Sequence, residues 1–174
     1  YDSKNVDFKA GGDLKWQINS NISVNATYNP DFATVEADQQ QVNLTRYEIN
    51  YPEKRLFFQE GNSMFNTRIK TFYSRRVKDI DFGIKFNGKV GPYQINLISA
   101  HSIEQPAGSE PSALFTAARV KRDFLKSSFA GFTLVDKLWD GQSTHSFSAD
   151  YLLNLGETWI LTGQFVGSAS TLKM

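Results

Sequence analysis

The strongest constraint on the fold is an alternation of apolar and polar residues with a period of two near the start of the chain. Over residues 6–18, apolar or small side chains occupy the even positions, and polar or small ones occupy the odd positions. Consecutive residues of a β-strand point to opposite faces, so this pattern predicts a strand with two unlike faces. Its thirteen residues exceed the roughly five or six of a typical strand and suit a tilted membrane strand of roughly 9 to 11 residues.

The same alternation recurs along the rest of the chain, with turn signals between the segments. We expect further strands near residues 22–28, 69–77, 80–86, 93–97, 113–123, 128–139, 146–155 and 158–165, and a short one between residues 42 and 47. Turns are expected at residues 19–20, 140–141 and 155–157, with a loop over 103–112. The Asn87-Gly88 dipeptide predicts a hairpin turn that extends to Gly91-Pro92. The pattern therefore predicts about eight or nine strands and no helix.

Composition excludes several classes of function. The 174 residues carry a formal charge of only +1, so no basic stripe for nucleic acid is expected. Cysteine is absent, and the two histidines, His101 and His145, are far apart in sequence, so no metal site is expected. The sequence has neither a Gly-x-Ser-x-Gly nucleophile motif nor a glycine-rich phosphate loop. We therefore expect no cofactor and no catalytic residue.

Residues 29–68 form an irregular insert between regular strands. The insert is dense in aromatic residues and in charges of both signs, and Pro30 and Pro52 interrupt it. A long irregular segment between strands is usually functional or disordered, and the aromatic content argues against disorder.

The insert also carries a family resemblance. The matching blocks are Asn-Pro-Asp-Phe at 29–32, Val-Glu-Ala-Asp at 35–38, Val-Asn-Leu-Thr-Arg at 42–46, Pro-Glu-Lys-Arg at 52–55, Phe-Phe at 57–58, Glu-Gly at 60–61 and Tyr-Ser-Arg-Arg at 73–76. They resemble the signature of DUF5916, a family of large Bacteroidetes proteins. In that family a carbohydrate-binding-like domain of family 9 type precedes a predicted outer-membrane β-barrel. Leu56 and Gln59 depart from the family pattern, which puts only the local loop shape in doubt.

Alternation alone fits both a soluble sandwich and a membrane barrel, because the two differ only in which face meets water. The length of the first strand, the aromatic strand ends and the resemblance favour an all-β, antiparallel up-and-down transmembrane β-barrel in the bacterial outer membrane. We interpret residues 1–174 as a fragment of a larger barrel, with the insert as a plug in the lumen or at its mouth. The sheet of this piece should then be open, with segments 6–18 and 158–166 not paired with each other and each with one unpaired edge.

The charges of the insert allow three interpretations. Ion pairing inside a wet lumen is the first, since partial burial makes an unpaired charge costly. Binding of a ligand or calcium is the second, and glycoside hydrolysis by two carboxylates is the third. The family-motif residues, which we also expect to form a network in the lumen, are Asn29, Pro30, Asp31, Phe32, Glu36, Asp38, Asn43, Arg46, Pro52, Glu53, Lys54, Arg55, Phe57, Phe58, Glu60, Gly61, Arg75 and Arg76.

The resemblance and the pattern together indicate a non-enzymatic outer-membrane protein, a component of transport or surface assembly linked to glycan handling. Its expected partners are outer-membrane lipid, other outer-membrane or surface proteins, and glycan. A soluble extracellular β domain that binds carbohydrate is the first alternative. A glycan hydrolase that uses insert carboxylates such as Glu53 or Glu60 is the second.

Overall fold

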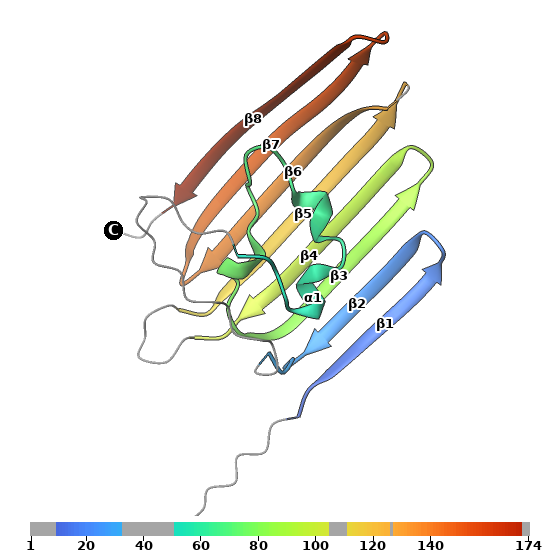
Figure 1. Ribbon diagram of the computed structural model, residues 1–174. Helices are drawn as coiled ribbons and strands as arrows, with labels where there is room; N and C mark the ends of the chain where they lie inside the picture. The colour runs from blue at the N-terminus through green and yellow to red at the C-terminus, as the bar shows by residue number, and fades with distance from the viewer. Residues whose placement is uncertain (1–9, 33–50, 105–110, 126, 172–174) are drawn as a thin grey trace, which may run out of the picture.

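One antiparallel sheet contains every strand of the described residues. The computed structural model describes residues 10–32, 51–104, 111–125 and 127–171. Each strand pairs with its neighbours in sequence order, from β1 to β8 (Figure 1). The strands are β1 (Gly12–Asn19), β2 (Ile22–Tyr28), β3 (Ile80–Val90), β4 (Tyr93–Ser102), β5 (Ala113–Phe124), β6 (Ser128–Trp139), β7 (Gln142–Leu155) and β8 (Trp159–Thr171). The all-β, up-and-down prediction is confirmed.

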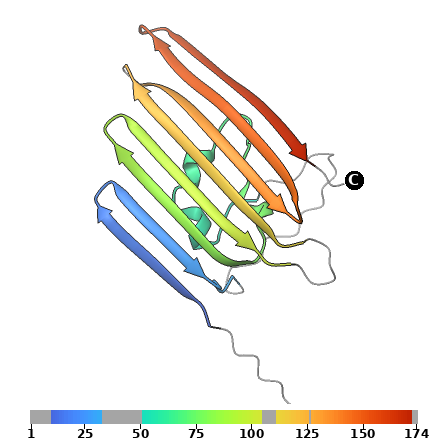
Figure 2. The ribbon, with the colours of Figure 1, turned by 180° about the vertical axis from the view of Figure 1, so that it is seen from behind.

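The sheet is open. β1 pairs only with β2 and β8 only with β7 among the described residues, so both outer strands have an unpaired edge. This confirms the predicted absence of pairing between the first and last strands. Short turns join β1 to β2, β3 to β4, β5 to β6 and β7 to β8 at one end of the sheet, which we call the hairpin end (Figures 1 and 2). The ends of β2, β4 and β6, and the turn at Asp140–Gly141, lie at the opposite end.

Three predicted boundaries are wrong. β1 begins at Gly12, after Ala10 and Gly11, while residues 1–9 lie outside the described residues. Asn87 and Gly88 lie within β3, because the turn forms at Gly91–Pro92, where Gly91 adopts a φ of 56°. β8 continues without interruption to Thr171, beyond the predicted end near residue 165.

One face of the sheet, which we call the uncovered face, carries the apolar half of each alternating pattern. A single row across all eight strands joins Trp16, Val24, Phe86, Leu97, Ala118, Leu134, Phe147 and Gly167. The large side chains remain accessible: Leu134 is 38% exposed and Phe147 is 49% exposed. At the end of the row, Gly167 lies where a Cβ would be 2.4 Å from the ring of Phe147, so the missing side chain makes room for that ring.

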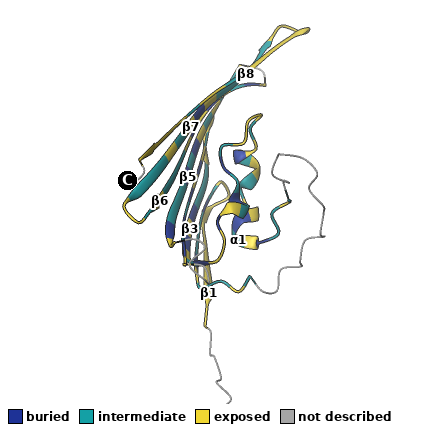
Figure 3. Cartoon of the chain, turned by 90° about the vertical axis from the view of Figure 1, so that its left-hand side faces the viewer, coloured by how far each residue is buried: buried dark blue, intermediate teal, exposed yellow. Residues whose placement is uncertain are grey.

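The opposite face, the covered face, carries the described part of the insert, which in the structure extends over residues 29–79, from the end of β2 to the start of β3. Figure 3 shows the insert on one side of the sheet, and Figures 1 and 2 show it in front of the sheet and then behind it. Its described part contains a short α-helix, α1 (Leu56–Gln59), and two 3-10 turns, η1 (Asn62–Phe65) and η2 (Ser74–Arg76). The prediction of no helix is therefore wrong.

The strand predicted over residues 69–77 is also absent. That segment runs irregularly and ends in η2, where the Val77 amide donates to the Ser74 carbonyl at 2.9 Å. Phe72 and Val77 are buried there. The apolar residues of this segment pack onto the sheet individually, so the alternation that predicted a strand has a different cause. The short strand predicted between residues 42 and 47 lies outside the described residues.

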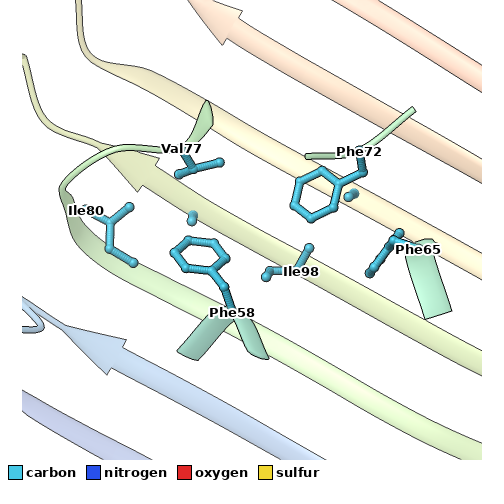
Figure 4. Packing of buried hydrophobic residues seen from close by; sticks show 8 residues of the cluster. Phe58, Phe65, Phe72, Val77, Ile80 and Ile98 are labelled. Carbon is cyan, nitrogen blue, oxygen red and sulfur yellow. The ribbon is translucent and has the colours of Figure 1, made fainter. Parts of the chain in front are cut away.

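An aromatic cluster fixes the insert to the covered face. Phe58, Phe65, Phe72 and Val77 from the insert pack against four sheet residues, namely Ile80, Ile98, Ala100 and Ala117 (Figure 4). Ala100 and Ala117 have small side chains, which lets the rings approach the strands closely. Burying one such ring contributes about 1.5 to 3 kcal/mol. None of the helices in the described residues is long and apolar enough to cross a membrane.

Candidate functional site

The insert is organised around a buried ion pair between Glu53 and Arg55. The Arg55 Nε donates to Glu53 Oε1 at 2.8 Å, and its Nη2 donates to Oε2 at 2.7 Å. The Glu53 side chain is only 3% exposed. The Ser74 hydroxyl, from the far end of the insert, donates to Glu53 Oε2 at 2.7 Å. One carboxylate therefore joins the beginning of α1 to η2.

The guanidinium of Arg55 donates hydrogen bonds to backbone carbonyl groups as well as to Glu53. Its guanidinium donates to the carbonyl oxygens of Val77, Lys78 and Ser74 at 2.5, 3.1 and 2.9 Å. It also lies over the ring of Phe58, 4.2 Å from the centroid, and over that of Phe32 at 5.2 Å. A charge buried with this many partners holds a fold together, because removing any one partner leaves an unsatisfied buried group.

The protonation of Glu53 reflects these contacts. Burial alone would raise its pKa, since a charged carboxylate loses its hydration. Hydrogen bonds from the Arg55 side chain and backbone and from Ser74, together with the Arg55 charge, outweigh burial and hold the pKa below its ordinary value. Glu53 is therefore an ionised structural group. Both of its oxygens are engaged, which leaves it poorly placed to exchange protons with a substrate.

Glu60 forms a second, more open cluster with strand residues. Its Oε1 accepts from Lys15 of β1 at 2.8 Å, and its Oε2 accepts from the Asn25 side chain of β2 at 2.6 Å. The Lys85 amine of β3 lies 3.8 Å from Oε2 and donates to the Phe57 carbonyl at 2.6 Å. The hydrogen bond from Lys15 is the main reason that the pKa of Glu60 is lowered. Three strands are thus connected to the end of α1.

A third ion pair lies within the sheet itself. Arg119 of β5 donates to both oxygens of Asp150 on β7, at 2.7 and 2.8 Å, and to the Thr133 hydroxyl at 2.7 Å. Gly131 of β6 lies between them, and a Cβ there would be 2.7 Å from Arg119 Nη2. The absent side chain lets the arginine reach across a whole strand. Arg119 therefore finds its carboxylate partner within the sheet and not in the insert.

The structure brings some of the predicted site residues together. Glu53, Arg55, Phe32, Phe57 and Phe58 meet at α1, where the Phe57 and Phe58 rings pack edge to face with centroids 5.0 Å apart. Four others lie outside the described residues, namely Glu36, Asp38, Asn43 and Arg46.

The remaining predicted residues lie around that centre. Asn29 closes the end of β2, with a φ of 44° and hydrogen bonds to the carbonyls of Asp81 and Ala10. Gly61 adopts a φ of 77° and lies against Asn87 and Asn96. Arg75 and Arg76 lie in η2, where the Arg75 cation is 5.9 Å from the Tyr51 ring. The last four are Pro30 and Asp31, which follow β2, and Pro52 and Lys54, which flank Glu53 ahead of α1.

Several partners were missed at the sequence level. The Glu60 cluster is completed by Lys15, Asn25 and Lys85. The ion pair within the sheet joins Arg119 to Asp150, and Thr133 accepts a further hydrogen bond from Arg119. The available signal was a charged or amide side chain at a covered-face position of a strand. Its partner is distant in sequence, so the pairing itself cannot be read from spacing. Among the described residues, no group of three or more His, Asp or Glu side chains is close enough to bind a metal ion.

Comparison with known families supports the sequence resemblance. The family model of a domain of unknown function (DUF5916) matches residues 1–91. This match includes β1, β2, the insert and β3, so it contains both the Glu53–Arg55 pair and the Glu60 cluster. Neither a curated protein nor a solved structure matches the chain.

Proposed function

The chain belongs to the DUF5916 family, and from that premise we propose that it forms part of an up-and-down β-barrel spanning the bacterial outer membrane. The residue 29–68 insert would fold into the lumen as a plug. The protein would act without catalysis, as a component of transport or surface assembly linked to glycan handling. Partners would be outer-membrane lipid, other surface proteins and glycan.

The observation that carries the proposal is the polarity of the two sheet faces. A water-soluble sheet hides its apolar face and wets its polar one. Here the polar face is covered by the insert, while the apolar face has no layer of described residues over it. Apolar surfaces of this extent on soluble monomers usually mark a contact with a partner or a membrane. Outer-membrane barrels have this arrangement, with apolar residues toward lipid and polar residues toward the lumen.

The dimensions of the uncovered face agree with a membrane. On β4 it runs from Tyr93 to His101, which is about 27 Å at roughly 3.4 Å per residue. A strand tilt of about 40° shortens this to about 21 Å across the membrane, close to the apolar band of about 25 Å in such barrels. Aromatic residues occur near both limits, with Tyr93 and Trp159 at the hairpin end and Tyr28 and Phe82 at the other. They would serve as interfacial girdles.

The covered face has the character of a lumen wall. Two buried arginines have carboxylate partners within hydrogen-bond distance, in the pair Arg55–Glu53 of the insert and the pair Arg119–Asp150 of the sheet. Such pairing is what makes a charge tolerable in a partly dry interior. The insert is anchored on this wall by aromatic packing and by Glu60, which supports a fixed plug. The unpaired edges of β1 and β8 are where further strands would pair to close the barrel.

Fractionation of cells that express the full-length protein tests the proposal. We expect the protein in the outer-membrane fraction, extractable only with detergent, and migrating differently on a gel before and after boiling. Recovery of folded protein from the soluble fraction without detergent would contradict the proposal and favour a soluble extracellular domain. Loss of glycan-degrading activity on Glu60→Gln substitution would favour a hydrolase.

A further inference from the structure

A large hollow lies between the insert and the covered face, away from the Glu60 cluster. Its volume is about 1110 Å³. One wall is the insert segment over residues 68–78, and the other is formed by β5, β6 and β7. The sheet contributes Phe115, Lys137, Trp139, Thr144 and Ser146. Ligand sites typically measure about 300 to 1,000 Å³, so the hollow is large enough for a ligand of several rings.

The charged side chains that line the hollow, among the described residues, are all basic. Six basic side chains face it, and no Asp or Glu of the described residues does; the six are Arg68, Lys70, Arg75, Arg76, Lys78 and Lys137. The whole chain has 19 basic and 18 acidic residues, so this separation of charge is local. A second hollow of about 990 Å³, beside β1 and β2, is lined by residues of both signs, including Asp13, Lys15 and Glu60.

Lys137 shows what kind of group the hollow suits. It projects from β6, with its amine 5.1 Å from the ring centres of both Phe115 and Trp139. Arg68, Lys70 and Lys137 form no ion pair with any described residue. Lysine and arginine bind carboxylate, sulfate and phosphate oxygens strongly. Trp139 and Phe115 add flat apolar faces, and Thr144 and Ser146 add hydroxyls.

We propose that this hollow binds an acidic oligosaccharide, a chain of sugar rings that carries carboxylate or sulfate groups. The cations would neutralise the acidic groups, and the apolar face of a sugar ring would pack on Trp139. The access of external solutes to this site depends on the proposed lumen. The hollow and the charge of its lining do not depend on that proposal. Arg75, Arg76 and Lys78 have further contacts of their own, so Arg68, Lys70 and Lys137 would supply most of the charge that an acidic ligand contacts.

Titration calorimetry on the purified full-length protein in detergent tests this proposal. The probes are trigalacturonate, the neutral trisaccharide maltotriose, and inorganic sulfate. We expect trigalacturonate to bind with one-to-one stoichiometry, and its affinity to fall as salt is raised, because ions screen exposed charges. Maltotriose should bind at least tenfold more weakly. Lys137→Gln should weaken trigalacturonate binding at least fivefold, and Lys137→Gln with Arg68→Gln at least twentyfold.

Lys89→Gln is the matched control. Lys89 lies near the hairpin end of β3 and does not line the hollow, so its substitution should leave affinity unchanged. Absence of trigalacturonate binding, or equal binding by wild type and Lys137→Gln, would overturn the inference. Sulfate binding as tight as that of trigalacturonate would overturn the assignment to a sugar.

The same preparations separate this inference from the proposed function. Each variant is first tested for outer-membrane location and for the gel shift on boiling. A protein that passes both tests but does not bind trigalacturonate would contradict the proposed saccharide site and would leave the proposed barrel standing. A protein that is soluble without detergent and still binds trigalacturonate would contradict the proposed barrel and would support the saccharide site.

Discussion

The uncovered face of the sheet exposes leucine and aromatic side chains such as Leu134 and Phe147, whereas the covered face buries Lys85, Arg119 and Asn96. The two faces alternate along the same strands, so local sequence alone does not decide which is buried. On the covered face, each of these three side chains donates a hydrogen bond, to the insert in the case of Lys85 and to another strand in the cases of Asn96 and Arg119. On the uncovered face, only an apolar medium or an apolar partner would make the exposed side chains favourable. The two faces therefore differ in what they contact.

The covered face also differs along its own width. A strip formed by Ile98, Ala100 and Ala117 is apolar and receives the insert rings, while polar and charged residues flank it. Phe57 lies over Gly83, where a Cβ would be 2.6 Å from the ring. The insert is thus positioned by shape as well as by charge, and the charged contacts are added around an aromatic centre.

The largest effect is expected from breaking the ion pair beneath the insert. Glu53→Gln removes the charge that neutralises buried Arg55, and removing one partner of such a pair costs about 3 to 5 kcal/mol. We expect the free energy of unfolding, measured by denaturant titration of the reconstituted full-length protein, to fall by that amount. Glu157→Gln, in the exposed turn between β7 and β8, is the control and should change little. Equal results for the two variants would show that the Glu53–Arg55 pair does not stabilise the fold.

The same contact predicts a pH dependence. The pKa of Glu53 is lowered in the folded state. Its contribution to stability is therefore present above the unfolded-state pKa, whose ordinary value is 4.5, and is lost as pH falls through the lower folded-state pKa. Wild type should lose stability in acid more steeply than Glu53→Gln. Parallel curves of unfolding free energy against pH for the two proteins would contradict this.

The next largest effect tests the uncovered face directly. Leu134→Arg would place a charge near the middle of the proposed apolar band, at a cost of about 2 to 4 kcal/mol for a lipid-facing position. Leu125→Arg makes the same change in the turn between β5 and β6, outside the band, where the cost should be about 0 to 1 kcal/mol. The measurements are the yield in the outer membrane and the free energy of unfolding from lipid vesicles. If both leucines faced water, the two variants would behave alike.

The sequence predicted the regular part of the fold well, because strand alternation is a local property. The range 128–139 was predicted for β6 and observed, and the turn at Asp140–Gly141 was placed correctly. Local signals failed where a second rule competed. Asn87-Gly88 has the composition of a hairpin turn, but the partner strand begins only at Tyr93, and pairing between β3 and β4 carries both residues into the ladder.

The candidate site was predictable only in part. The motif blocks identified Glu53, Arg55 and Phe58, which are neighbours in sequence and form one local centre. The partners Lys15 and Ser74 are distant in sequence, and only the folded insert brings them to Glu60 and Glu53. Residues 69–77 were predicted as a strand from their alternation, yet their backbone groups bond to Arg55 and within η2.

A smaller effect tests the crossing of β6 by Arg119. Gly131→Ala introduces a Cβ 2.7 Å from Arg119 Nη2 and 3.0 Å from Asp150 Oδ1, both of which are held in the ion pair. Crowding of this kind costs about 1 to 3 kcal/mol. Gly12→Ala on β1 is the control, since a Cβ there meets nothing within 4 Å. We expect the free energy of unfolding to be lower for Gly131→Ala than for Gly12→Ala. Unchanged stability in Gly131→Ala would mean that the ion pair can shift without loss.

The smallest effect is expected at Glu60, which undergoes the same chemical change as Glu53 in a different setting. Glu60→Gln removes a charge that bonds to Lys15, but the Glu60 side chain is 42% exposed, and exposed pairs contribute about 0 to 1 kcal/mol. Raising the salt concentration should reduce even this difference, because ions screen accessible pairs. The measurement is unfolding free energy at low and high salt, for wild type and variant. A loss as large as that of Glu53→Gln and insensitive to salt would indicate that the Glu60 cluster is shielded from water. The insert would then be held against β1 as firmly as it is held together at α1.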